Sequence, residues 1–101
     1  MAAPTRKISL VIADDHRVVR TGLRLLLERV EEIEVVGETG DAAEALALAR
    51  AGVDVLLLDL NMPGKPLEAL AELAGSPAGP AVVVLTIPRT RAASRDLVAT
   101  P

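Results

Sequence analysis

Short apolar runs alternate with segments of helical periodicity along this chain. The apolar runs are rich in valine, isoleucine and leucine, which is typical of strands buried on both faces of a parallel sheet. We predict four such strands, at residues 8–13, 33–38, 53–60 and 81–87. Between them, apolar residues recur at the three- and four-residue spacings of a helix face. This pattern predicts three helices, at residues 17–30, 42–51 and 67–74.

Local signals predict the ends and the buried faces of these helices. Asp15 is expected to cap the first helix and Asp41 the second, because a carboxylate at the N-cap accepts a backbone N–H. Gly52 suits the C-terminal cap of the second helix. The first helix is expected to bury a stripe formed by Val19, Leu23, Leu26 and Val30. The third helix is expected to turn inward Leu67, Leu70 and Leu73.

The alternation of strands and helices predicts an α/β fold. Parallel strands joined by right-handed helical crossovers form a sheet that helices cover on both faces. Ligands of such sheets bind beyond the carboxyl ends of the strands, at the point where the strand order reverses direction. Functional side chains are therefore expected immediately after the predicted strands.

Composition narrows the classes of function. The chain has 101 residues, about one small domain, and a formal net charge of −3, which argues against a generally basic nucleic-acid-binding protein. It contains no aromatic residue, no cysteine and one histidine. Aromatic base-stacking surfaces, disulfides, thiolate zinc sites and polyhistidine metal sites are thereby excluded.

The chain carries no evident membrane or targeting segment. The apolar runs are too short to span a membrane, and the run that follows the polar residues 1–7 is too short for a signal-peptide core. A soluble, cytoplasmic protein without a membrane partner is expected. The composition changes at Pro88, after which arginine dominates the charged residues. We therefore predict a domain over residues 1–87 and a divergent arginine-containing tail over residues 88–101.

Three acidic residues follow predicted strands. Asp14 and Asp15 end the first strand, and Asp59 lies near the end of the third. If these strands are neighbours, the three carboxylates converge at one edge of the sheet, where their mutual repulsion requires a cation. Carboxylates, water and substrate phosphate are the oxygen ligands that Mg²⁺ prefers. The alternative is that Asp14 and Asp15 only cap a helix and that Asp59 only ends a strand.

Other polar residues near these strand ends have both a functional and a structural interpretation. The hydroxyl of Thr86, after the fourth strand, would contact a phosphoryl oxygen bound beside Asp59, but threonine is also simply a good strand former. His16 is either a base or ligand, or a solvated residue at a helix start. Lys65 either supplies positive charge to the site or is an exposed loop residue.

The combined motifs resemble a known family. The acidic pair after the first strand, the stretch Asp59-Leu-Asn-Met-Pro-Gly64 and Thr86 resemble the receiver domain of bacterial two-component response regulators. Two further stretches, residues 11–24 and 35–46, resemble the subgroup that carries a LuxR-type DNA-binding domain. The resemblance covers residues 8–87 and implies a flavodoxin-like fold with strand order 2-1-3-4-5.

The resemblance also implies a reaction and a set of site residues. In this family a phosphoryl group passes from a sensor histidine kinase or a small phosphodonor to an aspartate. Asp59 matches that phosphoacceptor, and Thr86 matches the switch hydroxyl. The Mg²⁺ ligands of the family match Asp14, Asp15, Asp59 and the backbone carbonyl of Asn61. The resemblance thus implies a signalling domain, not an enzyme, in a phosphorelay that regulates transcription.

The family pattern stops after Ile87. The lysine and the aromatic residue that the family carries on a fifth strand are missing, as are the fifth strand and the last helix. The loop at residues 64–67 is one residue shorter than the family's. An incomplete domain is therefore expected, whose fourth strand is an apolar edge that invites pairing with a second copy of the chain. Arg89 and Arg91 are candidates to replace the lysine.

Three functions remain open at this point. The first is a phosphoacceptor switch that uses Asp59. The second is a module that binds a kinase or another regulator without being phosphorylated, or a non-functional fragment of such a regulator. The third is a small Mg²⁺-dependent phosphohydrolase, which lacks an evident general base. Direct binding of nucleic acid by these residues is not expected.

Overall fold

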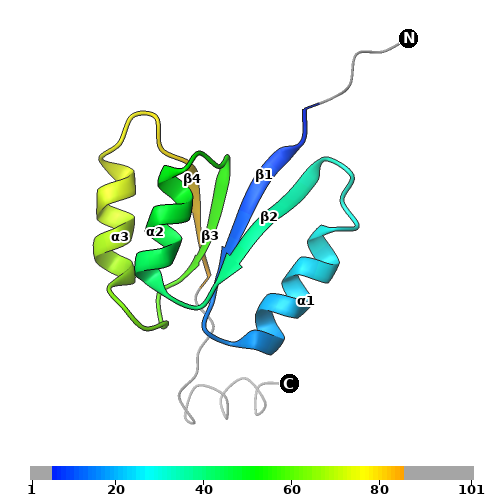
Figure 1. The fold of residues 1–101 in the computed structure, drawn as a ribbon, viewed down its shortest axis with the longest axis horizontal. Helices are drawn as coiled ribbons and strands as arrows, with labels where there is room; N and C mark the ends of the chain where they lie inside the picture. The colour runs from blue at the N-terminus through cyan, green and yellow to red at the C-terminus, as the bar shows by residue number, and fades with distance from the viewer. Residues whose placement is uncertain (1–5, 86–101) are drawn as a thin grey trace, which may run out of the picture.

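A computed structural model describes residues 6–85, which form a four-stranded sheet and three helices (Figure 1). Strands and helices alternate along the chain as the hydrophobic pattern predicts. Their bounds are β1 (Ile8–Ala13), α1 (Arg17–Leu27), β2 (Ile33–Thr39), α2 (Ala42–Arg50), β3 (Val55–Asp59), α3 (Pro66–Ala74) and β4 (Ala81–Leu85). The predicted boundary between residues 87 and 88 lies outside the described residues and stays a prediction.

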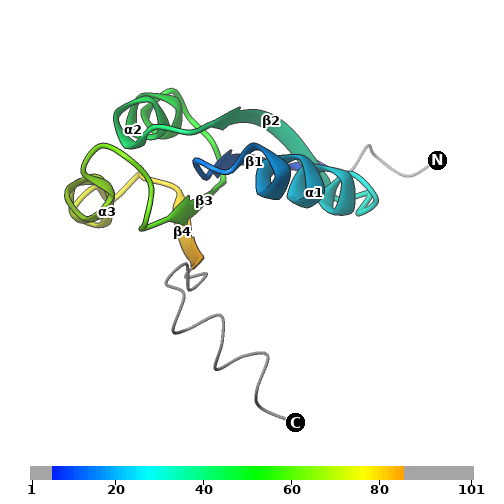
Figure 2. The ribbon, with the colours of Figure 1, turned by 90° about the horizontal axis from the view of Figure 1, so that it is seen from below.

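The strands of the sheet are parallel and lie in the order β2-β1-β3-β4. α1 packs on β1 and β2 on one face, while α2 and α3 lie side by side on the other (Figure 1, Figure 2). Right-handed crossovers require this placement, because the chain moves outwards from β1 to β2 and then returns past β1 to β3 and β4. The strand order reverses between β1 and β3, and the predicted α/β fold is confirmed. No helix of the described residues is long and apolar enough to cross a membrane.

A polar clasp joins β1 and β3 at the amino ends of the strands. The carboxylate of Asp54 accepts hydrogen bonds from the backbone N–H of Ser9 at 2.9 Å and from its hydroxyl at 3.1 Å. The guanidinium of Arg6 donates to the other carboxylate oxygen at 2.7 Å. The backbone hydrogen bond from Ser9 lowers the pKa of Asp54 most; partial burial opposes it, and the Ser9 hydroxyl and Arg6 add to the lowering. The clasp therefore fixes the register of β1 against β3 while Asp54 is ionised.

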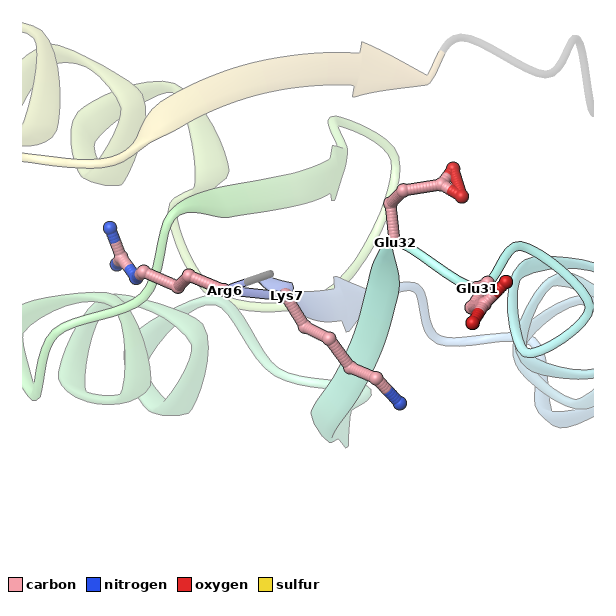
Figure 3. A pocket seen from close by; sticks show the side chains of 4 residues that line it. All are labelled: Arg6, Lys7, Glu31 and Glu32. Atoms are coloured by element: carbon pink, nitrogen blue, oxygen red, sulfur yellow. The ribbon is translucent and has the colours of Figure 1, made fainter. Parts of the chain in front are cut away.

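A shallow pocket of about 300 Å³ lies at the same amino edge, lined by Arg6, Lys7, Glu31 and Glu32. Figure 3 shows the four side chains spreading away from one another. Arg6 is also engaged by Asp54. Charges of both signs that do not converge offer no defined ligand geometry, so this pocket is not a candidate site.

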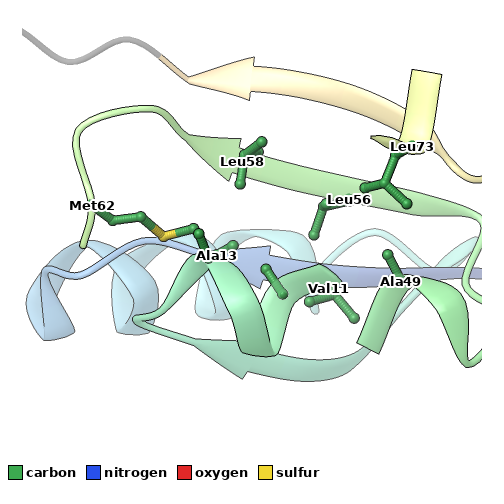
Figure 4. Close-up of a cluster of buried hydrophobic side chains, with 9 residues drawn as sticks. Val11, Ala13, Ala49, Leu56, Leu58, Met62 and Leu73 are labelled. Atoms are coloured by element: carbon green, nitrogen blue, oxygen red, sulfur yellow. The ribbon is translucent and has the colours of Figure 1, made fainter. Parts of the chain in front are cut away.

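The hydrophobic core lies between the sheet and the face formed by α2 and α3 (Figure 4). The strands contribute Val11, Ala13, Leu56 and Leu58. α2 buries only small side chains against them, those of Ala42, Ala45 and Ala49. Met62 and Leu73 complete the cluster, in the loop after β3 and in α3. The alanine face allows α2 to lie close to the sheet without leaving voids, because interiors pack at crystal-like density.

The helix ends agree in part with the sequence. Asp41 caps α2 as predicted, and its carboxylate accepts a hydrogen bond from the backbone N–H of Glu44 at 3.0 Å. Gly52 follows the end of α2 with a φ of 106°, the left-handed conformation that favours glycine. The predicted cap of α1 is wrong, because its N-cap is His16 and not Asp15. Asp15 lies one residue before this helix start, and His16 makes no side-chain cap hydrogen bond; its own N–H donates to the carboxylate of Asp14.

The stripes predicted for α1 and α3 are wrong at three positions. Leu26 is 62% exposed, and Val30 lies beyond the end of α1 and is exposed as well. α1 packs on β1 and β2 through other residues and buries none of them completely. In α3, Leu67 is 66% exposed. Its buried positions are Pro66, Ala69 and Leu73, because the small Ala69 side chain lets that face of the helix approach its neighbours.

The Asp54 clasp predicts an acid-dependent loss of stability. Since the folded-state pKa of Asp54 lies below its ordinary value, the unfolded chain binds more protons at acidic pH. The stabilisation is complete above the unfolded-state pKa and is lost as the pH falls through the folded-state pKa. We expect Asp54→Asn to lower the melting temperature at neutral pH and to flatten its decline below about pH 5. Thermal melts followed by circular dichroism measure this, and parallel pH curves for the two proteins would contradict it.

Candidate functional site

The sheet brings two of the predicted acidic residues to its carboxyl edge. Ala13 of β1 is paired with Leu58 of β3, so Asp14 and Asp59 follow directly on neighbouring parallel strands. Both carboxylates are completely buried. Two ionised carboxylates in this position repel each other, and burial removes the water that would screen them. The first and third strands are therefore neighbours, as the prediction requires, and Asp14 and Asp59 lie at the same edge of the sheet.

Each buried carboxylate is oriented by a backbone N–H two residues further along the chain. Oδ1 of Asp14 accepts a hydrogen bond from the N–H of His16 at 2.7 Å. Oδ1 of Asp59 accepts one from the N–H of Asn61 at 2.9 Å. These are aspartate turns, in which a short side chain takes the place of a backbone carbonyl. They fix how both carboxylates face the edge of the sheet and start the loop that follows each strand.

Asp15 and His16 extend the acidic cluster towards solvent. Nδ1 of His16 lies 3.1 Å from Oδ1 of Asp15 and 3.8 Å from Oδ1 of Asp14. Ligand atoms of the three residues all lie within 4.8 Å of one another, so the cluster has the dimensions of a metal site. Its carboxylate oxygens suit Mg²⁺, which prefers oxygen ligands and retains waters. The imidazole nitrogen of His16 is not a donor that Mg²⁺ prefers.

The loop after β3 is anchored to the start of α2. Met62 is buried, and the carbonyl oxygen of Pro63 accepts a hydrogen bond from the N–H of Ala42 at 3.2 Å. Gly64 has a φ of 89° and lies so close to α2 that a Cβ atom there would be 2.9 Å from Cβ of Ala42. The loop that carries Asn61 is thus held in place from both ends, by Asp59 and by α2.

The remaining predicted site residues are Lys65, Thr86, Arg89 and Arg91. Lys65 is the N-cap residue of α3, and its ammonium group is exposed and lies 3.9 Å from Glu68. The structure therefore pairs Lys65 with α3 and does not bring it to the acidic cluster. Thr86, Arg89 and Arg91 lie outside the described residues, and their predicted roles stay predictions.

Sequence reasoning missed Arg20. Its guanidinium Nη1 donates a hydrogen bond to the backbone carbonyl of Asp14 at 2.6 Å. In the sequence Arg20 is one of several arginines off the apolar stripe of the first helix, and nothing in the pattern separates it from a solvated residue. The signal that would have found it is a carbonyl acceptor at the end of a neighbouring strand, which only the folded geometry supplies.

The comparisons with known proteins agree with this arrangement. A family model described as the response regulator receiver domain matches residues 10–99. The chain belongs to this family. Receiver domains of response regulators are signalling domains that bind Mg²⁺ at an acidic phosphorylation site, and response regulators are phosphorylated by sensor histidine kinases. The resemblance drawn from the acidic residues and Thr86 is confirmed at the level of the family.

Two curated response regulators are similar to this receiver domain in sequence. The chain is 40% identical over 82 residues to the response regulator UvrY of Escherichia coli strain K12. The aligned region covers 79% of this chain and 38% of UvrY. The chain is 44% identical over 80 residues to the nitrate/nitrite response regulator NarP of the same strain, covering 77% of this chain and 37% of NarP. The chain thus spans less than two fifths of the length of the curated relatives that it matches.

Solved structures confirm the flavodoxin-like receiver fold. The signal receiver domain of NarL from Mycobacterium tuberculosis superimposes with a TM-score of 0.76 at 30% identity, covering 92% of this chain and 77% of that one. A DNA-binding response regulator of the LuxR family from Staphylococcus aureus gives 0.74 at 27% identity, covering 90% of this chain and 78% of that one. The predicted likeness to the LuxR-type subgroup is therefore confirmed.

The glycine at the tip of the site loop yields a prediction about stability. Gly64→Ala introduces a side chain at a φ of 89° and against Ala42. We expect it to lower the free energy of unfolding by about 1–3 kcal/mol. Gly22→Ala is a matched control inside α1, where a Cβ would meet nothing within 4 Å, and we expect it to raise stability by roughly 0.5–1 kcal/mol. Urea unfolding measures both, and equal effects of the two substitutions would contradict the prediction.

Proposed function

We propose that this receiver domain is a phosphoacceptor switch that carries its phosphoryl group on Asp59. The observation that carries the proposal is the pair of completely buried carboxylates, Asp14 and Asp59, on neighbouring strands at the point where the strand order reverses. The Asp59 carboxylate ends the strand that neighbours the one followed by Asp14 and Asp15, and an aspartate turn to Asn61 holds it in a fixed orientation. Membership of the receiver family supports the same assignment.

The proposed reaction is an in-line phosphoryl transfer. An oxygen atom of the Asp59 carboxylate attacks the phosphorus atom of a phosphohistidine or a phosphoramidate. The new O–P bond forms as the P–N bond breaks, and the leaving nitrogen takes up a proton. Such transfers ask the protein mainly for positioning and charge neutralisation. The hydrogen bond from Asn61 supplies positioning by holding Oδ1 of Asp59 while the carboxylate faces the donor.

The proposed metal ligands are Asp14, Asp15, Asp59 and the backbone carbonyl of Asn61. When bound, Mg²⁺ would supply positive charge between these carboxylates and the oxygens of the phosphoryl group. The residues of this chain hold the oxygen donors for it: the turns at Asp14 and Asp59 orient two carboxylates, and Asp15 presents a third from the solvent side. The dianionic phosphoryl group then adds charge and acceptor oxygens that need donors.

Thr86 is the proposed switch hydroxyl, and it lies outside the described residues. It follows Leu85, which is paired with Asp59 in the sheet. A hydroxyl that donates to the new phosphoryl oxygens would couple phosphorylation to the position of the chain after β4.

The proposed partner is a sensor histidine kinase, with a small phosphodonor as a substitute. The setting we propose is cytoplasmic, as is general for response regulators, in a phosphorelay that regulates transcription. Two observations point that way: the relatives include response regulators such as UvrY and NarP, and a structural match is a DNA-binding response regulator of the LuxR family. We propose no contact with nucleic acid by the residues of this chain.

Intact mass after incubation with Mg²⁺ and phosphoramidate tests the proposed phosphorylation. We expect one added phosphoryl group on the wild-type chain, and none on Asp59→Asn, because the amide cannot act as the nucleophile. Asp41→Asn is the matched control, since it changes another aspartate at the same edge of the sheet and asparagine still caps α2. This control should accept the phosphoryl group as the wild type does.

Three outcomes would contradict the switch. Phosphorylation of Asp59→Asn would place the acceptor elsewhere. No added mass on a wild-type chain that circular dichroism shows to be folded would favour a module that binds a kinase or regulator without phosphorylation. No added mass on an unfolded chain would favour a non-functional fragment.

A homodimer through β4 is the second interaction that we propose. In the part of the chain that the structure describes, β4 pairs with β3 alone, and Val83 and Val84 are 46% and 38% exposed. An apolar edge strand without charged residues is a template for pairing with another chain. We expect a dimer in sedimentation velocity and a shift to monomer in Val83→Lys. A wild-type chain that stays monomeric at all concentrations would contradict the dimer.

A further inference from the structure

Arg20 connects α1 to the acidic edge of the sheet. Its side chain is only 19% exposed, and Nη1 donates to the backbone carbonyl of Asp14 at 2.6 Å. That carbonyl belongs to the peptide group that joins Asp14 to Asp15. The N–H of Asp14 donates to the carbonyl of Thr39 at 2.9 Å. The backbone of Asp14 is therefore held at its N–H by β2 and at its carbonyl by Arg20.

Arg20 is itself held in place by β2. Its Nε donates to Oε1 of Glu38 at 3.3 Å, and Arg24 donates to Oε2 of the same carboxylate at 2.9 Å. Glu38 thus lies between two arginines of α1 and fixes the first of them over the Asp14 carbonyl. A planar guanidinium with donors on several sides makes both contacts at once, which the single ammonium of a lysine does not.

Gly40 leaves the space that the guanidinium occupies. A Cβ atom at this position would lie 3.0 Å from Nη1 of Arg20 and 3.5 Å from Cα of Asp15. An alanine there pushes the tip of the Arg20 side chain by a few tenths of an ångström, and it does so without changing any charge. The chain therefore offers a way to disturb the contact between Arg20 and Asp14 while the arginine stays in place.

We infer that Arg20 is a positioning residue for the metal-binding acids, acting through the Asp14 carbonyl. The inference rests on the proposed function, because it assigns a role towards the Mg²⁺ ligands of that site. Fixing the Asp14–Asp15 peptide group fixes where the Asp15 carboxylate stands relative to the buried carboxylates. Without that contact the acidic segment has more conformations to lose when a cation binds, and the affinity falls.

A purely electrostatic role of Arg20 would change the Mg²⁺ affinity in the opposite direction, so the two explanations can be distinguished by experiment. Arg20 is a cation near a cation-binding site, so a purely electrostatic effect would make Mg²⁺ bind more tightly to Arg20→Ala. Positioning makes it bind more weakly. Gly40→Ala keeps every charge, so electrostatics predicts no change for it and positioning predicts weaker binding.

Isothermal titration of the protein with MgCl₂ alone, without phosphodonor, measures the effect. We expect the dissociation constant of Arg20→Ala to rise about tenfold, the lower end of the loss found when partners of metal ligands are removed. Arg20→Lys retains the charge and should recover only part of the affinity. Gly40→Ala should weaken binding in the same direction by a smaller factor.

Arg24→Ala is the matched control. It removes the same charge from the same helix and breaks a contact to the same glutamate, but Arg24 does not touch Asp14. We expect it to lower the melting temperature about as much as Arg20→Ala does and to leave the Mg²⁺ dissociation constant close to that of the wild type. Amide hydrogen exchange without metal supplies a second readout, in which Arg20→Ala and Gly40→Ala speed exchange at Asp15 and His16 and Arg24→Ala does not.

The outcomes separate this inference from the proposed function. Tighter binding by Arg20→Ala, unchanged binding by both Arg20→Ala and Gly40→Ala, or equal weakening by Arg24→Ala would overturn the role of Arg20 and leave the phosphoacceptor intact. A folded wild-type chain that binds no Mg²⁺ and accepts no phosphoryl group would overturn the proposed function itself, and the role of Arg20 with it.

Discussion

The parallel pairing of β1 with β3 is the constraint on which the rest of the molecule depends. It places Asp14 and Asp59 one residue beyond a paired position, on strands that are hydrogen-bonded to each other. Their side chains are removed from water at the same edge of the sheet. Buried like charges are tolerated only when hydrogen bonds, opposite charges or a cation compensate them. The loops that leave these strands supply backbone N–H groups to both carboxylates, and Arg20 of α1 donates to the backbone carbonyl of Asp14.

The two ends of the sheet have different roles, since stabilising contacts lie at the amino end and the acidic residues lie at the carboxyl end. At the amino end, Ser9 and Asp54 satisfy each other and tie the same two strands together. At the carboxyl end, the acidic residues accumulate charge that does not favour folding. The register that the site needs is therefore secured by interactions that lie at the other end of the strands. Protonation of Asp54 weakens the fold without touching the acidic cluster.

The architecture was predictable because the hydrophobic pattern extends over the whole length of each strand and helix. Strand runs and helical spacing predict the order of elements, and right-handed crossovers then predict the sheet. The placement of Asp14 and Asp59 at one edge of the sheet was predictable for the same reason, since residues that follow neighbouring parallel strands lie side by side. The cap of α1 was not, because Asp14 turns back to accept the N–H of His16 and the helix begins after His16, which makes no side-chain cap hydrogen bond. The role of Arg20 and the outward position of Leu67 depend on how helices are rotated against their neighbours, which spacing alone leaves open.

The alanine face of α2 has a consequence for how such a domain can diverge. Ala42, Ala45 and Ala49 act as a spacer that sets the height of the helix above the sheet, and Ala42 is also the residue against which Gly64 packs. A larger side chain at Ala45 or Ala49 would lift the helix and carry the anchor of the site loop with it. Substitutions at this helix–sheet interface can therefore move the loop that carries Asn61 while the acidic residues keep their identity.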